Sequence, residues 1–222
     1  MMIFTGGADG SIFYNFLDVK AWGKAGGDAK SVTSDCSTAP QSKRVRRVSI
    51  VDEGHLLVLV DGGLLYSVEL DTQQWSLKWD DSQLKQCVAL VTQQSLTAVV
   101  TCGGKVAILD GEKPQWQLDL ACHCLEGVWV KNAEWNTSIL LVSGPSGTSH
   151  LVTYDSVQKS LVKTASLSTA KTAWITAAAQ RHDVLLCGDR GGSLRLFGLE
   201  ADVWKERQVL LHVHGQSEVC QV

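Results

Sequence analysis

Short apolar runs alternate with glycine-containing turns five times along this chain of 222 residues. In each copy an apolar run leads into the turn, a second apolar run follows it, and a hydrophobic residue followed by an acid ends the copy. The last glycine of each turn is Gly10, Gly63, Gly104, Gly147 or Gly192, so successive copies lie 53, 41, 43 and 45 residues apart. Long segments with helical periodicity are nearly absent. The pattern therefore predicts an all-β repeat protein.

The length and content of the repeat predict a β-propeller of the WD-repeat type with about five blades. Asp-Gly and Gly-Gly supply the positive φ of a tight hairpin, and the flanking Val, Leu and Ile suit half-buried strands. Each hairpin would be the middle pair of a four-stranded blade. Outer strands are expected near Trp22, Trp75 and Trp204, and innermost strands near 128–130 and 174–177. Because one blade cannot bury both of its faces, blades of this kind occur stacked in arrays.

Residues 1–222 are predicted to form a single propeller region with one long insertion. Residues 20–42 are rich in Gly, Ser and Thr, which is typical of a flexible loop between blades. The chain begins just before a middle hairpin, and residues 218–222 have the pattern of an innermost strand. That strand could complete the first blade and close a ring, which would remove an open sheet edge. Alternatively, the chain is an incomplete arc or a fragment of a longer propeller chain, and we favour this second interpretation.

Composition narrows the possible functions. A net charge of −3 argues against a protein that binds nucleic acid unaided over its whole surface. Seven cysteines, an odd number without framework spacing, predict reduced thiols in a cytosolic or nuclear protein. Neither a secretory leader nor an apolar run of the ~20 residues that span a membrane is evident. We therefore expect a cytoplasmic protein with no membrane partner.

The chain contains one basic cluster, which directly follows the insertion. Lys43, Arg44, Arg46 and Arg47 are four cations within five residues, and they could contact RNA phosphates. The alternative is a solvated basic strand at the start of the second blade. Strict alternation along a strand would place Arg44 and Arg46 on one face, and Lys43 and Arg47 beside Val45 on the other. Arg44 and Arg46 are therefore expected to be the more exposed pair.

Other candidate sites are weaker. Cys122-His123-Cys124 brings soft metal ligands together, but a zinc site would need a second pair, which here could only be distant, such as His212 and His214. We interpret these thiols as packing between blades and predict no metal. The eight tryptophans are likewise interpreted as packing between sheets rather than as a ligand platform. The sequence shows no assembled catalytic set and no phosphate-binding glycine loop before a helix, so we predict no catalytic residue and no cofactor.

The blades depart from the common WD-repeat pattern. Trp79-Asp80 falls on a predicted outer strand, and Gly54-His55 stands just before a hairpin rather than before an innermost strand. The Asp-His-Ser/Thr-Trp hydrogen-bond network of regular repeats cannot therefore be assumed. These are divergent blades.

Within the divergent class, the chain resembles the central region of the WD repeat-containing protein 6 family. The resemblance rests on residues 56–66 continuing to Trp75, on 140–147, and on 184–194 together with 211–215. It extends more weakly over nearly the whole chain. The Cys-Gly-Asp-Arg stretch with its flanks is its most specific part. Members of that family are much longer chains, in agreement with the fragment interpretation.

The resemblance implies a non-catalytic, regulatory subunit. Family members are similar to the partner of an FtsJ-type methyltransferase that adds a 2′-O-methyl group to the wobble ribose of certain tRNAs. The methyltransferase carries the catalytic residues and S-adenosylmethionine, and the propeller protein positions the tRNA. The implied partners are thus the methyltransferase and, through the complex, tRNA but not DNA. No functional residue of the family can be placed on a position of this chain.

Two other functional classes remain open for this chain. A generic propeller adaptor, in ubiquitin ligation or signalling, would have the same repeats and no RNA role. A quinoprotein-like enzyme or a bacterial docking propeller would fit the aspartate-to-tryptophan turns from Asp71 to Trp75 and from Asp110 to Trp116. Those repeats usually carry Thr-Gly at the turn, which this chain lacks, and the odd cysteines fit an exported protein badly.

Overall fold

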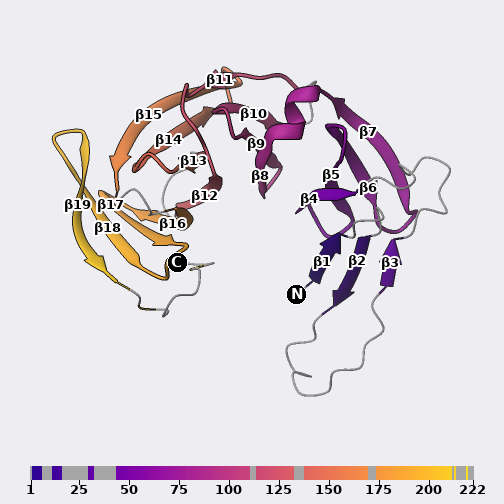
Figure 1. Ribbon diagram of the computed structural model, residues 1–222, viewed down its shortest axis with the longest axis horizontal. Helices are drawn as coiled ribbons and strands as arrows, with labels where there is room; N and C mark the ends of the chain where they lie inside the picture. The colour runs from indigo at the N-terminus through magenta and orange to yellow at the C-terminus, as the bar shows by residue number, and fades with distance from the viewer. Residues whose placement is uncertain are drawn as a thin grey trace, which may run out of the picture. The chain divides into compact units, whose positions relative to one another are not determined.

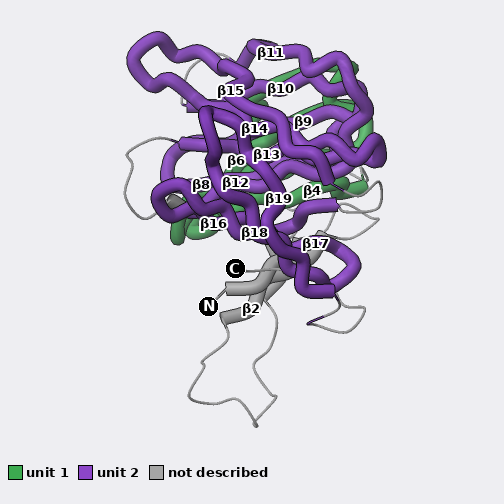
Figure 2. Tube along the Cα trace, turned by 90° about the vertical axis from the view of Figure 1, so that its left-hand side faces the viewer, with its two compact units in different colours: residues 1–85 green, residues 86–222 purple. Residues whose placement is uncertain are grey.

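The computed structural model describes residues 2–6, 12–16, 30–32, 44–110, 114–132, 138–169, 174–211, 213 and 219 (Figure 1). These residues form strands β1 to β19 and one short 3-10 helix, η2 (Ser82–Gln86), so the predicted all-β class is confirmed. Within the described part of the chain, no helix is long and apolar enough to cross a membrane. The chain divides into two compact units, Met1–Lys85 and Gln86–Val222 (Figure 2).

The first unit begins with a three-stranded antiparallel sheet. Its strands, in the order β1-β2-β3, are β1 (Met2–Gly6), β2 (Ile12–Phe16) and β3 (Lys30–Val32). β3 falls inside the segment 20–42, which the sequence pattern assigns to loop, and it pairs with β2 through Tyr14 and Lys30. The turn at Gly10, the tryptophan at 22 and the rest of that segment lie outside the described residues.

The second sheet of the first unit is a four-stranded antiparallel meander with the order β4-β5-β6-β7. Its strands are β4 (Val45–Ile50), β5 (His55–Val60), β6 (Leu64–Glu69) and β7 (Gln74–Asp80). β5 is buried along almost its whole length because its apolar run faces packed neighbours on both sides. The outer strand β7 carries Trp75 near its start, as predicted, and Trp75 packs with Val58 and Val68 in the core of this unit.

The second unit contains three further four-stranded meanders in chain order. The first consists of β8 (Cys87–Gln93), β9 (Leu96–Thr101), β10 (Lys105–Leu109) and β11 (Leu118–Asp119). The next consists of β12 (Glu126–Asn132), β13 (Ser138–Ser143), β14 (Thr148–Asp155) and β15 (Ser160–Ser168). The last consists of β16 (Ile175–Arg181), β17 (Val184–Asp189), β18 (Leu194–Glu200) and β19 (Val203–Leu210). The innermost strands predicted near 128–130 and 174–177 are thus confirmed as β12 and β16.

The last two meanders join into one eight-stranded sheet. β12 and β16 pair in parallel, with Val130 opposite Ala178 and Lys131 opposite Ala179 (Figure 1). All other pairings in this sheet are antiparallel. The two innermost strands therefore connect neighbouring blades through main-chain hydrogen bonds as well as through side chains.

Alternation along the strands distributes the core between neighbouring blades. On β13, Leu140 and Val142 pack with residues of β9 and β10, whereas Leu141 packs with residues of β17 and β18. On β14, Val152 likewise packs on the side of β9 and β10, and Leu151 packs on the side of β17 and β18. Successive residues of a strand point to opposite faces, so the blade of β12 to β15 buries one face against each of its two neighbours in the second unit. This is the stacking that the repeat predicts.

The four described glycine turns have the predicted backbone conformation. Gly63, Gly104, Gly147 and Gly192 have φ values of 83°, 90°, 77° and 81°. Each closes the hairpin between the two middle strands of its four-stranded meander. Of residues 218–222 only Val219 is described: its N–H donates to the Asp189 carbonyl at 3.2 Å, and its own carbonyl accepts from the Thr176 hydroxyl at 2.8 Å. A single propeller region over 1–222, and the choice between a ring and an arc, remain predictions.

Candidate nucleic-acid interface

The basic cluster lies at the start of β4, an end strand of its sheet. Arg44 directly precedes the strand, and Arg46 and Arg47 belong to it. All three side chains are exposed. Lys43 lies outside the described residues. β4 has no further strand beyond it in this sheet, although it contacts β1 of the first sheet. Because the arginine side chains are exposed, a ligand can reach them.

A β-bulge changes the way these side chains point. Val45 pairs with Val60 and Arg47 with Leu59, so Arg46 is an extra residue without a partner position on β5. The bulge interrupts the period of two, and Arg46 and Arg47 are both exposed while Val45 is buried. The expectation that Arg47 shares a buried flank with Val45 is therefore wrong. Three exposed arginines, rather than two, project from this end of the strand.

Arg44 and Arg46 contact the turn between β5 and β6. The Asp61 N–H donates to the Arg44 carbonyl at 2.9 Å, which holds the turn beside the start of β4. Arg46 forms an ion pair with Asp61 over 3.5 Å, with the two side chains 46% and 48% exposed. Arg47 donates to the Arg46 carbonyl at 2.9 Å. An exposed pair of this length contributes about 0–1 kcal/mol, so an incoming phosphate can compete for Arg46.

A buried charged network lies in the stretch that carries the most specific part of the resemblance. The Asp189 carboxylate accepts hydrogen bonds from the Gly191 and Ser193 N–H groups, both at 2.9 Å, and from Arg195 Nε at 3.1 Å. Arg195 also donates to both carboxylate oxygens of Glu206, at 2.9 and 3.2 Å. The network fixes the β17–β18 turn and links it to β19. Its role is structural, and sequence reasoning missed it, although strand alternation from Ser193 to Arg195 places both on the Asp189 side.

The cysteine pair packs in the core of the second unit. Cys124 is 1% exposed and belongs to the same cluster as Val142 and Val152. Its sulfur lies 3.6 Å from that of Cys122, and burial raises the pKa of the Cys124 thiol far above its usual range. A buried, protonated thiol is a poor metal ligand and a poor nucleophile. His212 and His214 lie outside the described residues, among which no group of three metal-binding side chains assembles.

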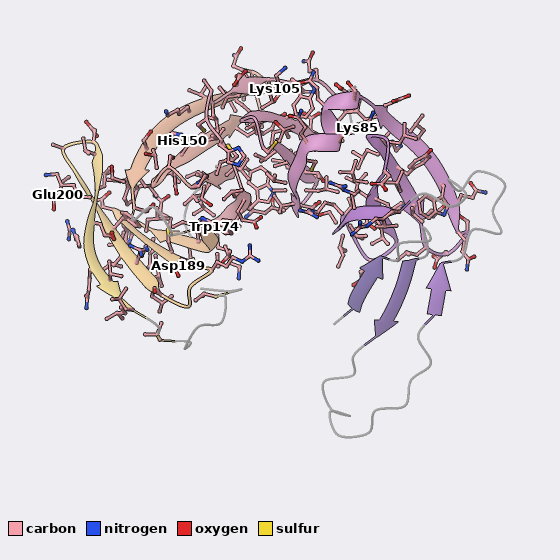
Figure 3. All side chains as sticks on the ribbon, in the orientation of Figure 1. Lys85, Lys105, His150, Trp174, Asp189 and Glu200 are labelled. Carbon is pink, nitrogen blue, oxygen red and sulfur yellow. The ribbon has the colours of Figure 1, made fainter. Side chains whose placement is uncertain are left out.

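Most of the described tryptophans pack as predicted. Trp75 and Trp79 are 5% and 9% exposed. Trp129 is half-buried, and its Nε1 donates to the Val91 carbonyl at 3.0 Å, which joins β12 to β8 in the neighbouring sheet. The exposed guanidinium of Arg190 instead lies over the Trp174 ring, 5.1 Å from the ring centroid, in a cation–π contact. Trp174 lies near the turn that Asp189 holds (Figure 3).

No protein-family model matches the chain, and no curated protein matches it in sequence. Its fold is similar to a chain of the mitotic checkpoint complex, with a TM-score of 0.66 and 11% identity over 99% of this chain and 66% of that one. A computationally designed protein is similar with a TM-score of 0.63 and 15% identity, over 99% of this chain and 61% of the designed one. PorZ, a surface component of the type-IX secretion system of Porphyromonas gingivalis, is similar with a TM-score of 0.56 and 12% identity, over 95% of this chain and 25% of its own.

The chain thus spans less than two thirds of the length of each of these structures. At such low identity the likeness concerns the fold alone. Together with the five meanders, which form four sheets, and the four positive-φ glycine turns, it shows that the chain is built from β-propeller blades.

Proposed function

We propose that the chain is a non-catalytic WD-repeat scaffold that supports 2′-O-methylation of the wobble ribose of tRNA by an FtsJ-type methyltransferase. The observation that carries this proposal is the sequence resemblance, and its most specific stretch, 184–194, forms β17, the Asp189 turn and the start of β18. A propeller fold suggests an interaction scaffold, because rigid blades present turns and strand edges to partners.

The division of labour follows from the chemistry of the reaction. Methyl transfer requires S-adenosylmethionine and residues that position the ribose hydroxyl, and in this proposal the methyltransferase supplies both. The propeller chain contributes a rigid surface that orients the tRNA, which lowers the entropic cost of bringing hydroxyl and methyl donor together. The proposed site of action is the cytoplasm.

In this proposal the arginines at the start of β4 contact the RNA. Arg44, Arg46 and Arg47 are exposed, and guanidinium groups pair with phosphate through two parallel N–H donors. Each phosphate that they neutralise releases condensed counterions, so the contact would favour RNA in a salt-dependent way. This feature allows a chain of net charge −3 to meet RNA at one place.

A knockout of the full-length protein tests the proposal. We expect 2′-O-methylation at the wobble position to fall in the substrates of the partner, and to return when the wild-type protein is re-expressed. Methylation at other tRNA positions serves as the control. The purified protein alone should transfer no methyl group from S-adenosylmethionine to tRNA. Wobble methylation that stays unchanged in the knockout would contradict the proposal.

A generic protein-interaction adaptor is the second candidate. It is favoured by exposed apolar side chains at the end of the last described strand, where Leu210, Leu211 and Val213 are 46%, 67% and 49% exposed. Apolar side chains gathered on a surface often mark a protein interface. Under this alternative, the knockout would leave wobble methylation unchanged, and the change of Leu211 to Glu would weaken a protein complex rather than RNA binding.

A further inference from the structure

A lysine far from the basic cluster in sequence lies at the same turn. Lys85 is exposed and belongs to η2, which follows β7 (Figure 3). The Asp81 N–H donates to the Gly63 carbonyl at 3.2 Å, and this bond ties the start of η2 to the 61–63 turn. A Cβ placed on Gly63 would clash with the Asp81 carbonyl oxygen and lie 3.4 Å from Cγ of Lys85. The stem of Lys85 thus runs along the turn whose other side faces Arg44.

The two ends of the β4–β7 sheet differ in charge. Every described Lys or Arg of residues 44–86 lies on the half of the sheet that contains the 61–63 turn: Arg44, Arg46, Arg47, Lys78 and Lys85. The opposite end, formed by the connections 51–54 and 70–73, carries carboxylates and no Lys or Arg: Asp52, Glu53, Glu69 and Asp71. The hydrogen bond from Leu70 N–H to the Gly54 carbonyl at 2.8 Å holds these two connections together.

The end of the sheet with the 61–63 turn also carries three carboxylates, Asp61, Asp80 and Asp81, against its five cations. Asp61 faces Arg46 at 3.5 Å, and Asp81 Oδ1 accepts the Gln83 N–H at 2.8 Å. At the opposite end, where no Lys or Arg balances the four carboxylates, Asp52 accepts the Gly54 N–H at 2.8 Å and lies 2.9 Å from the His55 ring. Glu69 accepts the Thr72 hydroxyl at 2.7 Å. A polyanion is therefore attracted to one end of the sheet and repelled from the other, because exposed charges act over about 8–10 Å at physiological salt.

We propose that Lys85 completes a phosphate-binding rim with Arg44 and Arg46 around the 61–63 turn, and that the backbone of an RNA runs along this end of the sheet. We call these three residues the basic rim. The inference rests on the proposed function, in which the chain contacts tRNA, and it names the place and the direction of approach. Lys85 acts as a point charge on a flexible stem, whereas the arginines supply planar donors, so the rim tracks a backbone without reading bases.

The experiment uses the full-length protein and an unmodified tRNA labelled with a fluorophore, with binding followed by anisotropy at several salt concentrations. The Lys85→Glu variant is expected to bind more weakly at low salt and to lower the slope of log K against log salt by about 1, the contribution of one phosphate contact. Lys85→Gln should fall between wild type and Lys85→Glu. Asp61→Asn, which removes the carboxylate that competes for Arg46, should bind more tightly.

Asp71→Lys is the matched control, because it adds positive charge at the opposite end of the same sheet. It should leave affinity and salt slope unchanged. The inference is overturned if Lys85→Glu keeps the wild-type slope, if Asp71→Lys raises affinity as much as Asp61→Asn, or if wild type shows no salt-dependent binding. It is also overturned if polyglutamate displaces the tRNA at equal charge concentration, since the ligand would then be an acidic protein surface.

The two proposals fail separately. Unchanged wobble methylation in the knockout would remove the methylation function but leave RNA binding at the basic rim measurable on the purified protein. Reduced methylation together with an unaltered salt slope in Lys85→Glu would keep the function and remove the basic rim. A thermal unfolding curve for each variant confirms that the blade is intact.

Discussion

Asp189 and Arg195 form a buried ion pair across the β17–β18 hairpin. Arg195 Nε lies 3.1 Å from Asp189 Oδ2, and the two side chains are only 7% and 4% exposed. Asp189 also holds the turn through two main-chain N–H groups, and Arg195 reaches on to Glu206. The turn of the last blade therefore depends on a charge pair that is almost completely buried.

Replacing Arg195 with Leu should destabilise the protein strongly. The change leaves the Asp189 carboxylate buried without its cation, a situation that costs about 3–5 kcal/mol. Urea unfolding followed by tryptophan fluorescence measures the loss. Arg207→Leu is the control, because Arg207 pairs with Glu200 on the surface at 3.4 Å, and it should leave stability nearly unchanged. Equal losses in the two variants would show that burial of the Asp189 pair does not matter.

Two adjacent glycines should respond very differently to alanine. Gly104 has φ of 90°, and a Cβ there would lie 2.7 Å from the Cys122 carbonyl oxygen, so Gly104→Ala should cost about 2 kcal/mol or more. A Cβ on Gly103 meets nothing closer than Gln86 Oε1 at 3.8 Å. Gly103→Ala should stay within about 0.5 kcal/mol of wild type. Thermal unfolding of the two variants side by side tests the comparison, and a larger loss for Gly103→Ala would contradict the turn geometry.

Turn glycines such as Gly63 and Gly192 could be predicted from the sequence, because few other residues accept positive φ and because the spacing of these glycines matches the length of a blade. The Asp189–Arg195–Glu206 network could not be predicted from the sequence. Glu206 lies on another strand, and only the register of β18 against β19 places it beside Arg195. The bulge at Arg46 could not be predicted either, because it depends on the register of β4 against β5.

The residues of the proposed site differ in how readily the sequence indicates them. A run of basic residues in the sequence points to Arg44, Arg46 and Arg47 as a cluster, since residues that are close in sequence stay close on a strand. Lys85 is 41 positions beyond Arg44 and reaches the same turn only because the meander returns there. Long-range proximity of this kind depends on strand order, which the local pattern does not encode.

Ionisation of Tyr154 should lower the free energy of unfolding at alkaline pH. Its hydroxyl donates to Asp110 Oδ2 at 2.6 Å, and burial together with this carboxylate raises the pKa of Tyr154 from 10 to about 12. A raised pKa stabilises the fold below the unfolded-state pKa, and this contribution is lost as pH rises from about 10 to about 12.

The Tyr154→Phe variant isolates this effect. Its free energy of unfolding should be lower than that of wild type at pH 8, and the difference should shrink as the pH approaches 12. Urea unfolding at several pH values gives the comparison, and the groups shared by both proteins cancel. A difference that grows with pH would mean that Tyr154 is easier to ionise in the fold than in the unfolded chain.

Reversing charge in the basic cluster should weaken tRNA binding without unfolding the blade. In Arg44→Glu combined with Arg46→Glu, two cations become anions, so the salt slope should fall by about 2 and the affinity at low salt should drop. Lys131→Glu combined with Lys163→Glu is the matched control, because both lysines are exposed and lie in the second unit. If the two double variants lose affinity equally, the arginines are only a solvated part of β4.

The parallel pairing of β12 with β16 has a consequence for the way the chain opens. The two blades that these strands begin share main-chain hydrogen bonds, so neither can lose its innermost strand without breaking the β12–β16 ladder that joins them. Amide protons of both should therefore exchange with solvent at similar rates, as one cooperative unit. The blade of β8 to β11 is a sheet of its own and borders these two blades through side-chain packing and a main-chain hydrogen bond from the Cys124 N–H to the Cys102 carbonyl at 2.9 Å. We therefore expect it to open before the two joined blades.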